Sequence, residues 1–217
     1  MDIKNRCKWA NPKNGLYLKY HDEEWGVPLY DDKRLYELLI LESFQAGLSW
    51  ECVLNKRESF RKAFDGFDVD KIISYGDAEK ERLLSDPKII RNRLKINAAV
   101  KNSAVFKDIQ REFGSFASYL WAFTDGKVVY EEYTLRTTSP LSNAISKDLK
   151  KRGMTFVGST IIYSYLQAAG VINGHGKECH CYKKTYQYRP RSTEDGILCI
   201  MRIRRGRSSL LHRGGSL

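Results

Sequence analysis

The sequence predicts an all-α fold, and three observations support this prediction. Apolar residues recur every three or four positions in several segments, which is the spacing of one face of a helix. Residues that favour helix N-termini, and glycines that favour helix ends, border these segments. The one run with β-like character, residues 127–130, has no clear pairing partner nearby.

The first predicted helix follows Asp31 or Asp32. Either aspartate can accept a hydrogen bond from the first turn and so cap the helix. The helical pattern continues as far as Glu42, and Gly47 can end the helix. A carboxylate therefore lies inside an otherwise apolar helix.

Three more predicted helices occupy the middle of the chain. Ser49 can cap a helix over residues 53–64, and Asp77 begins a short helix that ends near Leu84. A compact turn at Asp86-Pro87 precedes the longest helix. One face of that helix consists of Ile96, Ala99, Val100, Ser103 and Phe106.

Three predicted helices complete the body. The first covers residues 116–123 and precedes a turn at Asp125-Gly126. Ser142 can cap the second, which stops at Gly153, and the third covers residues 159–169.

Charge divides the chain into a helical domain, residues 1–186, and a basic extension, residues 187–217. The chain carries a net charge of +11, of which the extension contributes +5 through seven Arg, no Lys and two acidic residues. A basic body suits a phosphate-backbone partner, although a solvated basic surface has the same composition. We expect the extension to be disordered and to have no catalytic role.

The sequence favours a cytoplasmic protein that does not interact with membranes. It contains no stretch of about 20 apolar residues, and no signal peptide is visible at residues 1–8. Five cysteines, an odd number, argue against a disulfide framework. In a reducing compartment they are buried, catalytic or metal-bound. The cysteines are Cys7, Cys52, Cys179, Cys181 and Cys199.

Large aromatic residues surround the predicted position of Glu42 in the sequence. Aromatic faces stack on nucleobases, and a carboxylate accepts hydrogen bonds from an exocyclic amine. The alternative is that these aromatics are core residues and that Glu42 caps a backbone group. An unpaired buried carboxylate is costly, which favours a ligand site. The aromatics are Trp9, Tyr17, Tyr20, Trp25 and Trp50.

Residues that can bind zinc gather at the two ends of the body. Cys7 and His21 lie near its start, and His175 and Cys179 are one helical turn apart near its end, beside His180 and Cys181. Four Cys and His ligands are typical of structural zinc. The spacing is not that of a zinc finger, so an unrelated scatter of thiols and imidazoles is the alternative.

A basic turn joins two predicted helices at residues 86–96. A tight turn there offers free backbone amides and a helix N-terminus, both of which bind phosphate. Arg91, Arg93 and Lys95 add positive charge. A charged turn between helices is also common without any ligand.

Six segments in order, from about residue 6 to 182, resemble the DNA-3-methyladenine glycosylase I family. The segments are Arg6-Cys7-x-Trp9, Tyr20-His21-Asp22-x-Glu24-Trp25-Gly26-Val27-Pro28, residues 42–50, Ile89-Ile90-Arg91-Asn92-Arg93-x-Lys95-Ile96, Lys150-Lys151-Arg152-Gly153-x-x-Phe156-Val157-Gly158 and His175-x3-Cys179. Membership implies a helix-hairpin-helix DNA glycosylase fold. It also implies a monomeric, monofunctional enzyme that flips 3-methyladenine out of double-stranded alkylated DNA and removes it, the first step of base excision repair.

The resemblance also implies residue roles. One structural zinc ion would be held by Cys7, His21, His175 and Cys179 and join the two ends of the body. The base pocket would contain Trp9, Tyr17, Tyr20, Glu42 and Trp50, with Trp25 nearby and with Glu42 and Tyr20 as catalytic residues. The DNA contacts would be the wedge Leu48 and the basic residues Arg91, Arg93 and Lys95.

One departure from the family pattern concerns the zinc site. Gly174 precedes His175 where the family often has Asp, which removes a possible orienting partner. His180 and Cys181 do not match family ligand positions. Two other functions remain: a zinc-stapled DNA-binding module without catalysis, and metal-assisted hydrolysis, which needs an open zinc position.

Overall fold

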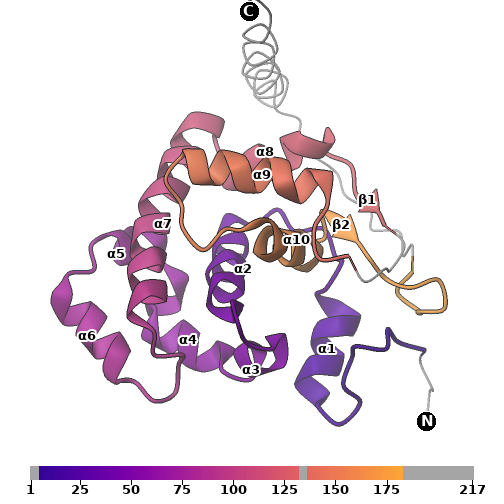
Figure 1. Cartoon of the computed structure of the whole chain (residues 1–217), viewed down its shortest axis with the longest axis horizontal. Coiled ribbons are helices and arrows are strands. Elements are labelled where there is room, and N and C mark those ends of the chain that lie inside the picture. Colours follow the sequence, from indigo (N-terminus) through magenta and orange to yellow (C-terminus); the bar gives the residue numbers. More distant parts are fainter. Residues whose placement is uncertain (1–4, 132–135, 183–217) are drawn as a thin grey trace, which may run out of the picture.

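A computed structural model describes residues 5–131 and 136–182, and these residues form a helical bundle (Figure 1). The α-helices are α1 (Gly15–Glu23), α2 (Asp32–Gln45), α3 (Trp50–Leu54), α4 (Arg57–Ala63), α5 (Val69–Ile73), α6 (Asp77–Ser85), α7 (Arg93–Phe113), α8 (Phe116–Trp121), α9 (Pro140–Lys151) and α10 (Ser159–Ala168). Two 3-10 turns, Asp65–Phe67 and Ala122–Thr124, and two short strands, β1 (Val129–Tyr130) and β2 (Ile172–Asn173), complete the described elements. The predicted helical class is confirmed.

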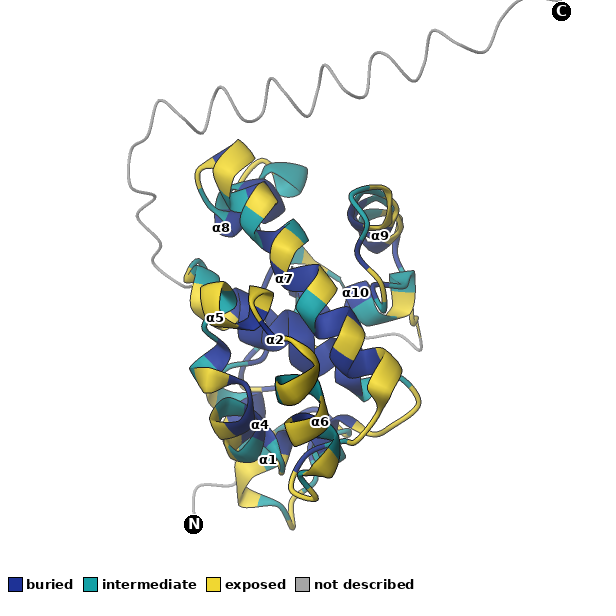
Figure 2. Cartoon of the chain, turned by 90° about the vertical axis from the view of Figure 1, so that its left-hand side faces the viewer, coloured by how far each residue is buried: buried dark blue, intermediate teal, exposed yellow. Residues whose placement is uncertain are grey.

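Helix α2 is the centre of the bundle. Every residue from Leu35 to Phe44 is buried, Glu42 included, and α7, α8 and α10 pack against this helix (Figure 2). Asp31 caps it by accepting a hydrogen bond from the backbone N–H of Arg34 at 2.8 Å, as predicted. Because α2 is buried on all sides from Leu35 to Phe44, a polar side chain in this part of the helix faces either a partner or a cavity.

The two ends of the described chain meet beside α1. The backbone N–H of His180 donates to the carbonyl oxygen of Asn5 at 2.9 Å. The segment after β2 therefore lies against the segment that precedes α1 (Figure 1). This contact closes the body and brings the two predicted halves of the metal site together.

Three predictions about the elements need correction. The helix predicted over residues 53–64 is interrupted between α3 and α4, where Asn55 caps the end of α3. Ser139, not Ser142, caps α9, because Pro140 at the first helical position needs no hydrogen-bond partner and Ser139 accepts from the N–H of Ser142. The run 127–130 does contain a strand: β1 pairs in parallel with β2.

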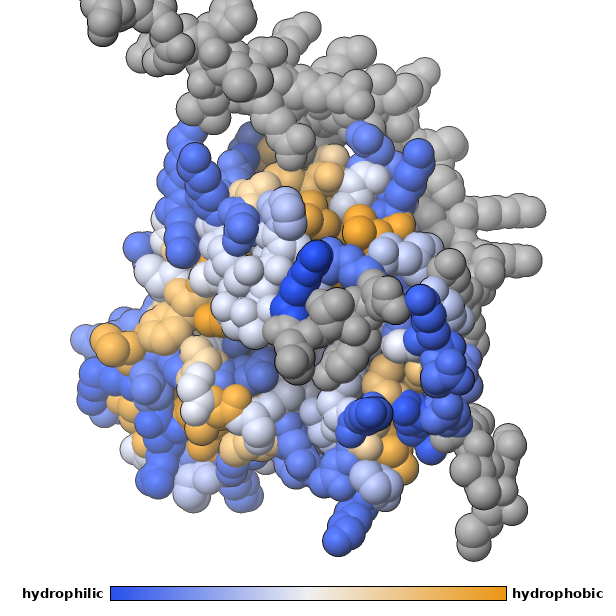
Figure 3. Space-filling model, turned by 45° about the vertical axis from the view of Figure 1, so that its right-hand side comes forward, coloured by the Kyte–Doolittle hydropathy of each residue, from blue (hydrophilic) through white to orange (hydrophobic). Residues whose placement is uncertain are grey.

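The face of the molecule drawn in Figure 3 is mainly hydrophilic, with apolar patches among the described residues. Within the described ranges, no helix has the length and apolar character needed to cross a bilayer. The predicted basic extension, residues 187–217, lies outside the described residues.

Candidate functional site

Four side chains from both ends of the body converge on one point. Cys7, His21, His175 and Cys179 place their ligand atoms within 4.8 Å of one another. Cys179 Sγ lies 3.5 Å from His21 Nε2 and 3.4 Å from His175 Nδ1. Tetrahedral zinc with ordinary Zn–S and Zn–N bonds would separate S and N ligand atoms by roughly 3.6 Å. The cluster therefore has the composition and spacing of a closed zinc site.

Each histidine of this cluster is oriented by a second partner. His21 Nδ1 lies 2.8 Å from Asp22 Oδ1, and His175 Nε2 lies 3.0 Å from the carbonyl oxygen of Trp25. Burial lowers the pKa of His175 to about 4, so its imidazole is neutral and its Nδ1 carries a free lone pair. Such partners fix the ring orientation of metal-binding histidines.

Gly174 does not leave His175 without an orienting group. The carbonyl of Trp25 supplies that function, because the backbone turns sharply at Gly26, where φ is +75°. A Cβ at Gly26 would lie 3.1 Å from the His175 ring. The missing Asp at position 174 is therefore compensated by the loop between α1 and α2.

The aromatic residues line a cavity of about 340 Å³, within the usual size range of small-molecule sites. Tyr20 and Trp50 lie at its buried end with ring centroids 5.2 Å apart, and Trp9 contacts Tyr17 and Trp25 at 5.4 and 4.8 Å. The structure thus brings together the five predicted aromatics and Glu42.

Two polar atoms at this cavity are buried without a hydrogen-bond partner among the described residues, Glu42 Oε2 and Trp50 Nε1. Burial raises the pKa of Glu42 to about 8. Buried polar atoms in native proteins are usually paired, so an orphaned acceptor and donor at one cavity indicate a ligand that pairs with them. A ligand with positive charge would favour the ionised form of Glu42.

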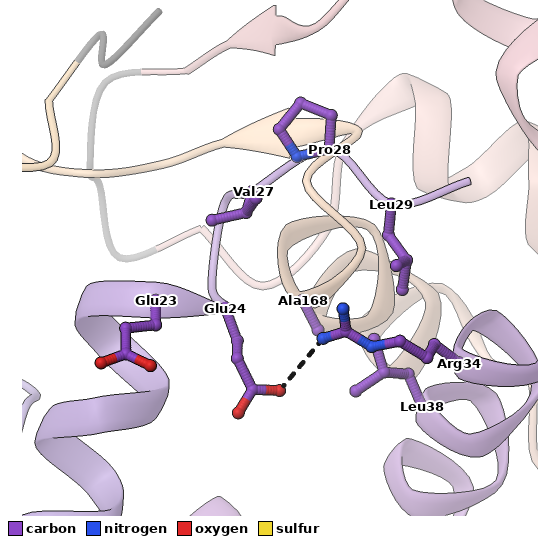
Figure 4. A pocket seen from close by; sticks show the side chains of 8 residues that line it. All are labelled: Glu23, Glu24, Val27, Pro28, Leu29, Arg34, Leu38 and Ala168. Carbon is purple, nitrogen blue, oxygen red and sulfur yellow. Dashed lines mark ion pairs between the residues drawn. The ribbon is translucent and has the colours of Figure 1, made fainter. Parts of the chain in front are cut away.

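An ion-pair network connects helices that carry pocket residues. Arg57 binds Glu24 at 2.7 Å and also contacts Glu37, and Arg34 reaches Glu24 at 3.5 Å across a small depression of about 40 Å³ (Figure 4). This network joins the end of α1 to α2 and α4. The depression contains none of the predicted site residues, and of the network only Glu24 and Arg34 line it.

The predicted DNA-contacting residues lie in different environments. Leu48, between α2 and α3, is 42% exposed beside the pocket residue Gln45. Arg91 is exposed, and Arg93 forms a surface ion pair with Glu81 at 2.7 Å. These three residues can meet a partner.

Lys95 cannot make the predicted phosphate contact in this conformation. Its side chain is buried, and its ammonium donates to the carbonyl oxygens of Phe44 and Ala46 at 2.8 and 2.6 Å. These carbonyls end α2, where a cation is favourable because of the helix dipole. Lys95 therefore links α7 to the end of α2 next to the pocket.

Sequence reasoning missed several residues of the pocket. The cavity wall also contains Gln45, Arg136, Thr137, Ser164 and Gln167. Ser164 and Gln167 are three positions apart on α10, so a helical-face reading of residues 159–169 would have paired them. The carbonyl of Trp25 carried no sequence signal, because a backbone atom has none.

The fold and these two clusters define a helical protein with a buried carboxyl group, unpaired among the described residues, at an aromatic pocket and a compact cluster of Cys and His side chains beside it. Residues 9–182 match the methyladenine glycosylase family, and the chain belongs to that family. It is therefore a glycosylase.

Named relatives agree with this assignment. The chain is 42% identical to DNA-3-methyladenine glycosylase 1 of Escherichia coli, over 82% of this chain and 96% of the relative. A crystal structure of 3-methyladenine DNA glycosylase I matches with a TM-score of 0.79 at 42% identity, covering 82% of this chain and all of the other. A variant of such an enzyme in complex with 3-methyladenine matches with a TM-score of 0.77 at 36% identity, covering 80% and 96%.

Proposed function

We propose that the protein hydrolyses the N-glycosidic bond of 3-methyladenine in alkylated double-stranded DNA. The observation that carries this proposal is Glu42, an unpartnered buried carboxyl group at a cavity lined by aromatic rings. Methylation at N3 gives adenine a positive charge. The cation stacks on the aromatic rings and stabilises the Glu42 carboxylate, which accepts a hydrogen bond from the base edge.

The same pairing explains how catalysis proceeds without a strong general acid. A cationic base leaves the sugar as a neutral molecule, so no prior protonation is needed. The Glu42 carboxylate and the buried Tyr20 contact the base, and the carboxylate also favours the positive charge that develops on the sugar as the bond breaks. The described lining of the pocket contains no lysine, so no covalent imine forms and the strand stays intact.

The remaining assignments concern zinc and DNA. Cys7, His21, His175 and Cys179 would hold one zinc ion, which supplies a fixed link between the chain ends; four protein ligands leave no position for a reactive water. Leu48 would fill the space vacated by the flipped base. Arg91, in the turn between α6 and α7, and Arg93, the first residue of α7, would meet DNA phosphates as parts of a helix-hairpin-helix unit.

Release of free base from methylated duplex DNA tests the proposal. We expect the purified protein to release 3-methyladenine, to leave unmodified adenine in place, and to leave the strand uncut until alkali is added. For the pocket variant Glu42→Gln, the matched control is Glu58→Gln at an exposed position of α4, which should keep wild-type activity. Binding of the duplex without any base release would instead support the DNA-binding module.

A further inference from the structure

Part of the pocket wall is polar. This wall includes the side chains of Gln45, Ser164 and Gln167. None of these three side chains has a hydrogen bond or ion pair with any described residue. The exposed guanidinium of Arg136 lies at the same cavity. The cavity therefore offers neutral donors and acceptors that the contacts proposed for the base do not use.

Helix α10 fixes the position of this wall. Ser164 and Gln167 are half-buried, and their neighbours Tyr163, Tyr165 and Leu166 are buried in the core. Residues three apart lie on one face of a helix, so both side chains face the cavity. The carbonyl oxygen of Gln167 also accepts the N–H of Gly26 at 2.9 Å, which ties this turn of α10 to the α1–α2 loop.

The glycine at position 174 makes room for the Gln167 amide. A Cβ on Gly174 would lie 2.8 Å from Gln167 Nε2 and 3.3 Å from Cη2 of Trp25. Any side chain at position 174 would therefore displace the amide from its place beside Trp25. The departure from the family pattern at Gly174 thus affects the pocket wall, while the Trp25 carbonyl preserves the orientation of His175.

We propose that Ser164 and Gln167 form a sugar subsite, which binds the deoxyribose-phosphate unit of the extruded nucleotide while the aromatic wall binds its base. Neutral hydroxyl and amide side chains are common donors to sugar and phosphate oxygens. The nearby Arg136 places positive charge where the phosphate enters. These residues act as positioning residues, because they orient the sugar while the bond to the base breaks. The inference rests on the proposed glycosylase function.

Two ligands separate the subsites: free 3-methyladenine, and a duplex with a tetrahydrofuran abasic site, which has a sugar but no base. For Gln167→Ala and Ser164→Ala we expect the affinity for the abasic duplex to fall ~3- to 10-fold, as for the loss of one or two hydrogen bonds. Single-turnover excision should fall similarly, and the Kd of the free base should stay unchanged. Thr160→Ala, exposed on the same helix, is the matched control.

The variant Gly174→Ala tests the proposed link between Gly174 and Gln167. It should reproduce the loss seen in Gln167→Ala, and it should cause no further loss in the Gln167→Ala background, because no amide remains to be displaced. Zinc content and melting temperature must stay at wild-type values, since His175 is adjacent.

Each outcome has a distinct meaning. If Gln167→Ala weakens binding of free 3-methyladenine but not of the abasic duplex, Gln167 reads the base and the sugar subsite is wrong. Unchanged affinities for both ligands and unchanged excision also overturn it. A wild-type protein that releases no base contradicts the proposed function itself, and that result is visible before any variant is compared.

Discussion

Tyr20 and His21 are consecutive residues of α1, yet they belong to two different clusters. In one cluster the polar ring atoms have partners, and in the other some buried polar atoms have none among the described residues. On the His21 side, each histidine has both ring nitrogens close to a partner: His21 contacts Cys179 and Asp22, and His175 contacts Cys179 and the carbonyl of Trp25. On the Tyr20 side, Glu42 and Trp50 each keep one buried polar atom unpaired. A satisfied cluster stabilises the fold, whereas an unsatisfied one awaits a ligand.

The largest effect should come from breaking the satisfied cluster. We expect Cys179→Ala to lose bound zinc and to lower the melting temperature by about 10 °C or more, because metal binding contributes to folding free energy. Cys181→Ala is the matched control: this thiol is also buried and two positions away, but it is not among the four converging ligands. Metal analysis and calorimetry measure both effects. Equal melting temperatures for the two variants would contradict a structural role for the cluster.

The unsatisfied cluster should respond in activity, with the fold intact. Glu42→Gln keeps the shape of the side chain but removes the negative charge that pairs with a cationic base. We expect single-turnover excision to slow about 100-fold, which corresponds to about 2.7 kcal/mol of transition-state stabilisation. The Kd of free 3-methyladenine should rise as well. Wild-type kinetics in a folded variant would remove Glu42 from the site.

A smaller effect should be visible in stability against pH without any ligand. Burial raises the pKa of Glu42 to about 8, from an ordinary value of 4.5. The folded state therefore binds more protons than the unfolded state between these values, so this group lowers stability as pH rises from about 4.5 to about 8. Relative to Glu42→Gln, the wild type should lose stability between pH 5 and pH 8 and lose little more above that pH. Parallel stability curves from denaturant unfolding would show that Glu42 is paired in the free protein.

The same contrast explains which parts of the structure the sequence could predict. The start of α2 follows from its Asp31 cap, and the starts of α6 at Asp77 and α10 at Ser159 follow from local sequence pattern, so all three could be predicted. The parallel pairing of β1 with β2 was not, because the paired residues Val129 and Ile172 are distant in the sequence. Non-local pairing depends on how the helices between the strands pack.

The site residues divide in the same way. For Cys, His and aromatic side chains, the residue type alone indicates metal binding or stacking. The family resemblance predicted which of them converge. Lys95 was wrongly expected to contact phosphate because its sequence neighbours are basic, whereas packing of α7 against the end of α2 buries its ammonium. Ser164 and Gln167 were overlooked because a shared helix face indicates a site only once the cavity beside that face is known.

Because the body closes beside α1, its two ends can meet only after both have been synthesised. Cys7 meets His175, 168 positions later in the chain. Ribosomes make the N-terminal side first, so Cys7 and His21 are synthesised well before His175 and Cys179. Trp9 and Tyr17 form part of the pocket on the segment that this late cluster holds in place. The aromatic pocket can therefore be completed only after the segment that carries His175 and Cys179 has been synthesised, and we expect a chain truncated before Cys179 to lack base-release activity.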